Sequence, residues 1–249
     1  MRPGSLAILG IAAYSIFLVA TMPARWVAER SLPAEGRFAL REVEGTIWHG
    51  SAKAAIGSMT STLGVDRIEW RFLPSRLMQG RAAYDVATKG AGFEARGELG
   101  RGFSGWSVHG LSARADAAIA TAILPWAGPW RPEGTLAATA ESLDLADQRL
   151  HGALRVDWTD AAVALSDVRP LGSYRAEVLA DGAVARIAVT SQGGALRVAG
   201  QGQLQLPSQL TFTGEARGEG PNAAALERLL DLMGPRRPDG ARAIEWRTR

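Results

Sequence analysis

The three histidines are the side chains of this chain best suited to metal binding or acid–base chemistry. His49, His109 and His151 stand roughly 40 to 60 residues apart, and no second ligand accompanies any of them at the spacing of a metal site. The chain has no cysteine, which excludes thiolate zinc sites, cysteine nucleophiles and disulfides. We therefore expect exposed strand histidines and predict no metal site.

Two pairs of aspartates are of a residue type that could perform general acid–base catalysis. Asp144 and Asp147 form one pair, and Asp157 and Asp160 form the other. Both pairs stand at the ends of predicted strands beside turn signals, where an aspartate bonds its own backbone. The pattern therefore favours turns over catalysis.

Phosphate binding and a serine nucleophile are not indicated either. The glycines at 90, 92, 97, 100 and 102 are followed by no Lys-Ser or Lys-Thr pair and by no predicted helix start, so they form no phosphate cradle. Ser104 lacks the Gly-x-Ser-x-Gly frame of a nucleophile elbow. The sequence predicts no catalytic residue and no cofactor, and we expect a protein that is not an enzyme.

Tryptophan is the residue type that could build a binding surface. The chain has eight, which are most simply core residues. A curved sheet lined by Trp and Leu could also hold an acyl chain or contact a partner, because a half-open apolar face must be covered. The candidate partner or groove contacts are Trp48, Trp70, Trp130 and Trp158.

The distribution of charge argues against a nucleic-acid partner. The chain carries 26 Arg and 2 Lys against 25 acidic residues, a net charge of +3 with no run of five like charges. This spread is typical of a solvated, arginine-coated surface. With 249 residues, the chain can bury a sizeable core without disulfides.

The amino terminus predicts a membrane anchor. Leu6 to Met22 contains seventeen uncharged residues, and a helix of that length spans about 26 Å, close to the roughly 30 Å of a bilayer core. Candidate signal-peptidase sites have a large residue at their outer position, which favours an uncleaved anchor over a signal peptide. A buried core helix is the other alternative, but no other segment is apolar enough to pair with it. We expect a cytoplasmic tail at 1–4, an anchor at 5–22, a linker at 23–36 and a periplasmic β-rich domain at 37–249.

The rest of the chain has the period-two pattern of strands. Short alternating runs, cut by glycine every eight to twelve residues, have one apolar and one polar face. This pattern favours an antiparallel sheet with one covered face over a doubly wound parallel sheet. We predict a mainly β protein with a curved antiparallel sheet. The runs are Ile68–Phe72, Tyr84–Val86, Trp106–Val108, Leu136–Ala138, Leu143–Leu145, Leu154–Trp158, Val163–Leu165, Tyr174–Val178, Ile187–Val189, Leu196–Val198, Leu204–Leu206 and Leu210–Phe212.

Two segments have helical spacing instead. Residues 222–233 place Leu and Met at i, i+3, i+4 and i+7, with Asn222 as the expected N-cap and Gly234 as the stop. Residues 116–124 form a weaker counterpart, capped by Asp116 and ended by Pro125. We expect both to be short helices that cover part of the sheet.

The segments after the two helices repeat each other. Residues 128–134 (GPWRPEG) and 234–240 (GPRRPDG) share five identical positions. Gly45-Thr46-Ile47 likewise resembles residues 134–136, and a Trp and a Tyr follow each at similar offsets. The pattern predicts two copies of one unit, at 45–128 and 134–234, and a partial third strand at 240–247. In this interpretation Thr46, Ile47 and Trp48 open the first strand of a unit.

With these features, the chain resembles protein N of the bacterial type II secretion system nearly end to end. The resemblance rests on the order and spacing of the apolar amino terminus, Gly45–Ala52, Ile68–Leu77 with Gly80, Leu171–Tyr174, the closing Leu-rich helix with Gly234, and the strand after Gly240. It implies a non-enzymatic scaffold or accessory subunit, anchored in the inner membrane and facing the periplasm, in the machine that exports folded proteins. The partners it implies are other secretion subunits, meaning the inner-membrane platform proteins with the secretin as a further candidate.

The repeated β units are also similar, more distantly, to the AsmA-like group of envelope proteins with lipid-holding grooves. That likeness implies an alternative function, a β-groove protein that binds envelope lipid or glycan. No nucleic-acid partner is expected under either interpretation.

Overall fold

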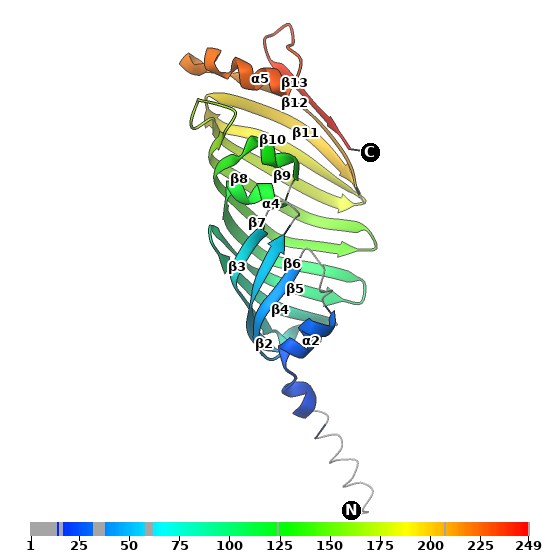
Figure 1. The fold of residues 1–249 in the computed structure, drawn as a ribbon. Helices are drawn as coiled ribbons and strands as arrows, with labels where there is room; N and C mark the ends of the chain where they lie inside the picture. The colour runs from blue at the N-terminus through cyan, green and yellow to red at the C-terminus, as the bar shows by residue number, and fades with distance from the viewer. Residues whose placement is uncertain are drawn as a thin grey trace, which may run out of the picture.

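The fold is a single large antiparallel β-sheet (Figure 1). The computed structural model describes residues 14, 17–31, 38–57, 62–123, 125–206 and 208–248. Thirteen strands lie in the order β1 to β13, so each strand pairs with its neighbours in sequence. The prediction of a mainly β protein with one antiparallel sheet is confirmed.

The strands lengthen toward the middle of the sheet and then shorten again. They are β1 (Phe38–Gly45), β2 (His49–Gly57), β3 (Thr62–Phe72), β4 (Arg81–Gly90), β5 (Phe93–Gly102), β6 (Gly105–Asp116), β7 (Pro132–Ala146), β8 (Arg149–Val163), β9 (Gly172–Gly182), β10 (Val184–Gly194), β11 (Leu196–Gln205), β12 (Gln209–Gly218) and β13 (Arg242–Arg247).

The helices occupy the connections and the amino-terminal end of the sheet. They are α2 (Ala24–Ser31), α3 (Pro74–Leu77), η1 (Ala117–Ile119), α4 (Ala120–Ile123), η2 (Pro125–Trp130), η3 (Gly220–Asn222), η4 (Ala224–Leu226) and α5 (Glu227–Met233). The two helical segments expected from the sequence are α4 and α5 with their 3-10 turns. The short helices α2 and α3 were not predicted, and α2 lies within the expected linker.

Of the two N-caps expected from the sequence, Asp116 is confirmed and Asn222 is not. Asp116 caps η1, because its carboxylate accepts a hydrogen bond from the Ala118 amide at 3.0 Å. Asn222 is not an N-cap, since it lies inside η3, and Leu226 precedes α5 without any side-chain cap. The Leu spacing found the right segment, but two 3-10 turns replace the first part of the expected helix.

The alternation of side chains gives the sheet one apolar and one polar face. On the apolar face, Trp158 of β8 lies opposite Tyr174 of β9. Two residues along β9, Ala176 lies on the same face, between Val156 of β8 and Val189 of β10. This face is concave in Figure 1 and carries α4. The opposite, convex face carries charged side chains that pair across strands, such as Arg155 with Glu177.

Most predicted strand runs are confirmed, although their boundaries differ. The twelve runs fall in β3, β4 and β6 to β12, and three pairs of runs prove to be parts of one strand each, in β7, β8 and β11. Leu165 and Leu206 lie beyond strand ends. The glycine-rich β5 was missed because its glycines interrupt the apolar alternation: a Cβ at Gly97 would lie 3.3 Å from the His109 carbonyl oxygen.

Residues 46–48 form the turn between β1 and β2, which corrects the expectation that Thr46, Ile47 and Trp48 open a strand. The Thr46 hydroxyl accepts hydrogen bonds from the amides of Trp48 and His49, each at 3.3 Å, and the Thr46 amide donates to the His49 carbonyl. Gly45, with φ +84°, pairs with Gly50 across the turn. Thr and Ile have high strand propensity, but the hydroxyl of Thr46 supplies the local hydrogen bonds that favour a turn here.

The main hydrophobic core lies in the carboxyl-terminal half, where α5 packs on the concave face. Leu226, Leu229 and Leu230 meet Val163, Leu171, Leu196 and Ala216 in one buried cluster. The helix spacing that predicted this segment thus reflects its burial.

The expected anchor, residues 5–22, lies largely outside the described residues. Within the part of the chain that the structure does describe, no helix is long and apolar enough to cross a bilayer. The duplication stays a prediction. The stretch 45–128 contains five strands, β2 to β6, whereas 134–234 contains six, β7 to β12.

Candidate functional site

The helical connections after β6 and after β12 lie on the same side of the sheet. Because the strands form a meander, the connections after even-numbered strands gather on one side, which we call the helix side. Those after odd-numbered strands gather on the other, the turn side. On the helix side, residues 117–130 and α5 fold over the concave face and flank an apolar cavity.

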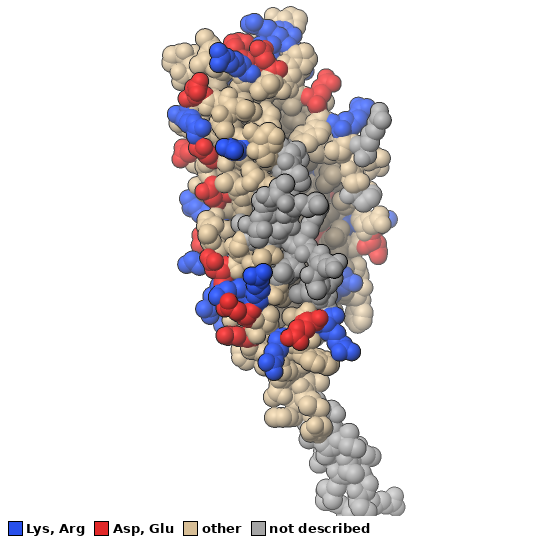
Figure 2. Space-filling view, viewed as in Figure 1, with Lys and Arg blue, Asp and Glu red and all other residues tan. Residues whose placement is uncertain are grey.

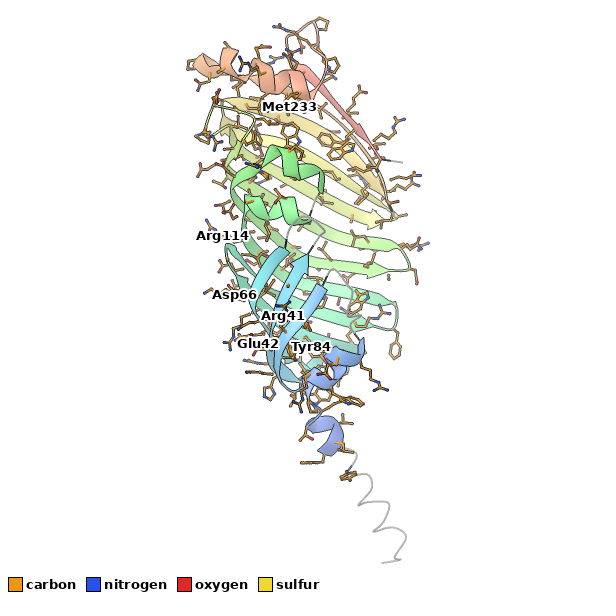
Figure 3. All side chains as sticks on the ribbon, viewed as in Figure 1. Arg41, Glu42, Asp66, Tyr84, Arg114 and Met233 are labelled. Carbon is orange, nitrogen blue, oxygen red and sulfur yellow. The ribbon has the colours of Figure 1, made fainter. Side chains whose placement is uncertain are left out.

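This apolar cavity has a volume of about 350 Å³, within the range of small-molecule sites. Its walls come from the two helical connections and from β7 to β11. The lining residues are Ala117, Ala120, Ala127, Trp130, Pro132, Leu136, Trp158, Val163, Leu171, Tyr174, Val189, Leu196, Val198, Leu229 and Met233. Met233 belongs to α5 and packs against the buried cluster (Figure 3).

Two of the four predicted contact tryptophans, Trp130 and Trp158, line the apolar cavity. The Trp158 ring lies 5.9 Å from the Tyr174 ring, and its indole nitrogen donates to the Glu133 carbonyl oxygen at 3.0 Å. Trp130 ends η2 and packs against the carboxyl-terminal core. The polar atom of Trp158 is therefore satisfied by backbone, which leaves its apolar ring toward the cavity.

The other two, Trp48 and Trp70, do not line this cavity. The Trp48 indole nitrogen donates to the Val19 carbonyl oxygen at 2.8 Å, and its ring packs edge-on against Phe72. The Trp70 indole nitrogen donates to the Thr46 carbonyl oxygen at 3.1 Å. These two residues lock the β1–β2 turn to the sheet and to the segment that precedes α2.

Tyr174 is the one hydroxyl-bearing residue in the cavity wall, and its hydroxyl is already engaged. It donates to the Leu196 carbonyl oxygen at 2.9 Å. Burial raises the pKa of this hydroxyl above its ordinary value of 10.0. Tyr174 is thus a neutral wall residue at physiological pH, and its hydroxyl proton is engaged by the Leu196 carbonyl.

Sequence reasoning found the aromatic wall but missed the helix contribution. Leu229 and Met233 stand on the helical stripe that was taken only as sheet cover, and they reach the same cavity as Trp130. The sequence signal that could have revealed this contribution was the helical spacing of these residues, because an apolar stripe on a helix must contact another apolar surface.

The histidines lie apart from the apolar cavity, each beside different groups. His49 sits next to the Thr46 hydroxyl at 3.5 Å, His109 next to Arg81 at 3.2 Å, and His151 next to Asp181 at 3.4 Å. In the described ranges, no group of three or more His, Asp and Glu side chains could hold a metal ion.

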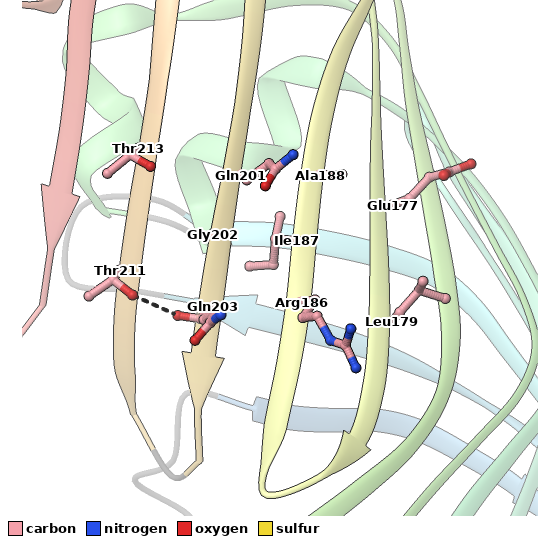
Figure 4. Close-up of a pocket in the computed structure, with 10 residues that line it drawn as sticks. All are labelled: Glu177, Leu179, Arg186, Ile187, Ala188, Gln201, Gly202, Gln203, Thr211 and Thr213. Atoms are coloured by element: carbon pink, nitrogen blue, oxygen red, sulfur yellow. Dashed lines mark hydrogen bonds between the residues drawn. The ribbon is translucent and has the colours of Figure 1, made fainter.

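The convex face bears depressions whose linings mix polar and apolar side chains. One, of about 470 Å³, crosses β9 to β12 and presents Gln201, Gln203 and Thr213 beside Glu177 and Arg186 (Figure 4). Charged side chains also gather along the margins of the molecule in Figure 2. The convex face thus presents polar and charged side chains to solvent, whereas the concave face offers apolar burial.

The comparisons with known proteins give one match. A family model described as type II secretion system, protein N, matches residues 36–245. No curated protein and no solved structure matches the chain significantly.

Proposed function

The chain belongs to the protein N family of the type II secretion system, and we propose that it serves that machinery as a non-enzymatic scaffold or accessory subunit. In this proposal the inner membrane holds the chain by residues 5–22, and the sheet stands in the periplasm. Its partners are the inner-membrane platform proteins, with the secretin as a further candidate.

The observation that carries the proposal is the extent of the family match. It begins just before β1 and ends within β13, so it spans the whole sheet. The uncharged run from Leu6 to Met22 precedes it and has the length of a membrane span.

Anchoring and orientation can be tested with single cysteines, because the chain has none of its own. Gln148, in the exposed β7–β8 turn, is one suitable position for Gln148→Cys. We expect a membrane-impermeant maleimide to label it from the periplasmic side, and the protein to resist carbonate extraction. Labelling only after the inner membrane is broken would contradict the proposed orientation.

Partner contact can be tested by photo-cross-linking in native membranes from Trp48 and Trp130. A probe at Gln201, on the polar convex face, serves as the control. The scaffold proposal expects another secretion subunit to be captured from at least one tryptophan position. Capture of lipid alone at both positions would contradict the proposal that the surfaces around Trp48 and Trp130 contact another secretion subunit.

The apolar cavity favours a second candidate function, which is binding of an envelope lipid. Its lining side chains are apolar except for the Tyr174 hydroxyl and the indole nitrogens of Trp130 and Trp158, and the hydroxyl and the Trp158 nitrogen are both bonded to backbone carbonyls. A peptide there would leave backbone N–H and C=O groups without partners, whereas an acyl chain brings none. Each methylene buried contributes about 0.8 kcal/mol.

Lipid binding can be tested with two matched substitutions. Ala120→Phe fills the apolar cavity from α4, and Ala199→Phe places the same ring on the exposed convex face of β11. Native mass spectrometry of the full-length protein should find lipid on the parent and on Ala199→Phe, and less on Ala120→Phe. Equal lipid on both variants, or none on the parent protein, would overturn this second function.

A further inference from the structure

The tips of two turns on the turn side expose large apolar side chains. Met78, in the β3–β4 connection, is 93% exposed, and Phe103, in the β5–β6 turn, is fully exposed. The two tips are neighbours, since a Cβ placed on Gly80 would lie 3.9 Å from the Phe103 ring. Neither side chain contributes to the core, and exposed apolar groups of this size cost solubility unless something covers them.

The next turn along the same side is polar. Asp147 and Gln148 form the tip between β7 and β8, and both have positive φ in a tight turn. The β7–β8 tip therefore exposes no large apolar side chain, unlike the tips at Met78 and Phe103. The contrast indicates that large, almost fully exposed apolar tips are not a general property of the turns.

The chain's amino-terminal segment is tied to the same side of the sheet. The Ile47 amide donates to the Met22 carbonyl oxygen at 3.0 Å, and Trp48 bonds Val19 through its indole nitrogen. These contacts hold the end of the apolar run 6–22 against the β1–β2 turn, two connections away from Phe103. Figure 1 shows α2 at this end of the sheet.

Arginines accompany the exposed aromatics in this region. The Arg30 guanidinium lies 5.6 Å from the ring centre of Trp26, which α2 exposes, and Arg101 lies 4.9 Å from the ring centre of Trp106. Among the described side chains, neither arginine forms an ion pair. Aromatic rings beside cations, with apolar tips beyond them, match the layered polarity of a bilayer interface.

We propose that Trp26, Met78, Phe103 and Trp106 form a membrane-contact rim that lies in the headgroup region of the bilayer. Met78 and Phe103 enter the acyl boundary, and Arg30 and Arg101 meet anionic headgroups. The rim limits the tilt of the sheet over the membrane and adds to the two hydrogen bonds that tie Val19 and Met22 to the β1–β2 turn. This inference rests on the proposed membrane anchoring of the chain.

The test uses the full-length protein in nanodiscs of phosphatidylethanolamine and phosphatidylglycerol. Met78→Cys and Phe103→Cys carry an environment-sensitive fluorophore, and Gln148→Cys on the polar turn is the matched control. All three positions are on exposed turns, so the substitutions leave the core intact. The probes at 78 and 103 should show blue-shifted emission in the apolar acyl region and should be quenched when the acyl chains are brominated, whereas the probe at 148 should show neither effect.

The outcomes separate the rim from the anchor. If carbonate extracts the protein, the proposed anchoring fails. If the protein stays in the membrane but the probes at 78 and 103 emit like the probe at 148, only the rim is overturned. Shielding at 78 and 103 that appears in native membranes and is absent in nanodiscs would assign the rim to a protein partner and also overturn it.

Discussion

At the scale of single residues, Gly50 decides whether Trp70 can occupy its position. A Cβ at Gly50 would lie 2.5 Å from a Trp70 ring carbon and 2.4 Å from the Glu44 carbonyl oxygen, neither of which can move away freely. Gly50→Ala should therefore lower the free energy of unfolding by about 1–3 kcal/mol, the usual cost of overpacking. The unfolding midpoint in urea measures this loss.

Gly64, on the neighbouring strand β3, provides the matched control. No described atom lies within 4 Å of the position its Cβ would take. Gly64→Ala should leave the urea midpoint unchanged or raise it slightly, because alanine restricts the unfolded chain. Equal midpoints for the two variants would contradict the close packing of Trp70 on Gly50.

The burial of Tyr174 makes the free energy of unfolding depend on pH. Its folded-state pKa is raised by burial, whereas in the unfolded chain it stays near 10.0. Above that pH the unfolded chain loses the proton and the folded protein keeps it, so the free energy of unfolding falls as pH rises. The contribution is fully present at neutral pH and is lost in alkali.

Tyr174→Phe tests this dependence through urea midpoints measured from neutral pH to beyond pH 10. We expect the variant to lose about 1 kcal/mol at neutral pH, since the Leu196 carbonyl loses its donor, and to fall less steeply in alkali than the parent. Burial also raises the pKa of Tyr84, so Tyr84→Phe should flatten the curve in the same direction. A Tyr174→Phe curve parallel to that of the parent would show that this hydroxyl does not control the alkaline transition.

At the scale of elements, one arginine fastens α5 to the last strand. Arg242 on β13 is buried, and its guanidinium contacts Glu227 at 2.8 Å and Asp231 at 2.5 Å on α5. Arg242→Ala should release the helix at a cost of about 1–2 kcal/mol, a modest value because both acids are partly exposed and screened. Hydrogen exchange of the α5 amides should then speed up more than exchange in β8.

Arg228, exposed on the same helix, is the control for charge removal. Arg228→Ala should leave α5 exchange close to that of the parent protein. If Arg242→Ala does the same, the helix is held by its leucines alone and the ion pairs add nothing measurable.

The elements also show why sequence reasoning succeeds in some places and fails in others. Leu229 and Leu230 revealed a helix because their spacing reflects burial, which dominates the energy. Thr46 and Ile47 were misassigned to a strand because one hydroxyl bonding two amides outweighed their strand propensity. Periodicity reports burial, whereas local side-chain hydrogen bonds leave no periodic signal.

At the scale of the whole molecule, the alternating faces were readable from the sequence and the cavity was not. The single-file order of strands agrees with short connections between neighbouring runs. Trp130 and Trp158 were identified as contacts, but their meeting with Met233 depends on two helical connections crossing to the same side. Contacts between residues this far apart in the sequence depend on the topology of the fold, which a single sequence does not reveal.

The whole molecule thus presents a polar convex face, an apolar concave face and, in our proposal, an amino-terminal end held at the membrane. For a secretion subunit, this arrangement would leave most of the sheet free to contact partners in the periplasm. The rim and the apolar cavity lie on opposite sides of the sheet, the turn side and the helix side, so lipid bound in one would not obstruct the other.

Gene deletion tests whether the protein works in the export of folded proteins. The measurement is the distribution of a folded exoprotein between periplasm and medium, with the full-length gene returned as the control. We expect the exoprotein to accumulate in the periplasm of the deletion strain and the returned gene to restore its release. Normal release from the deletion strain would contradict this expectation.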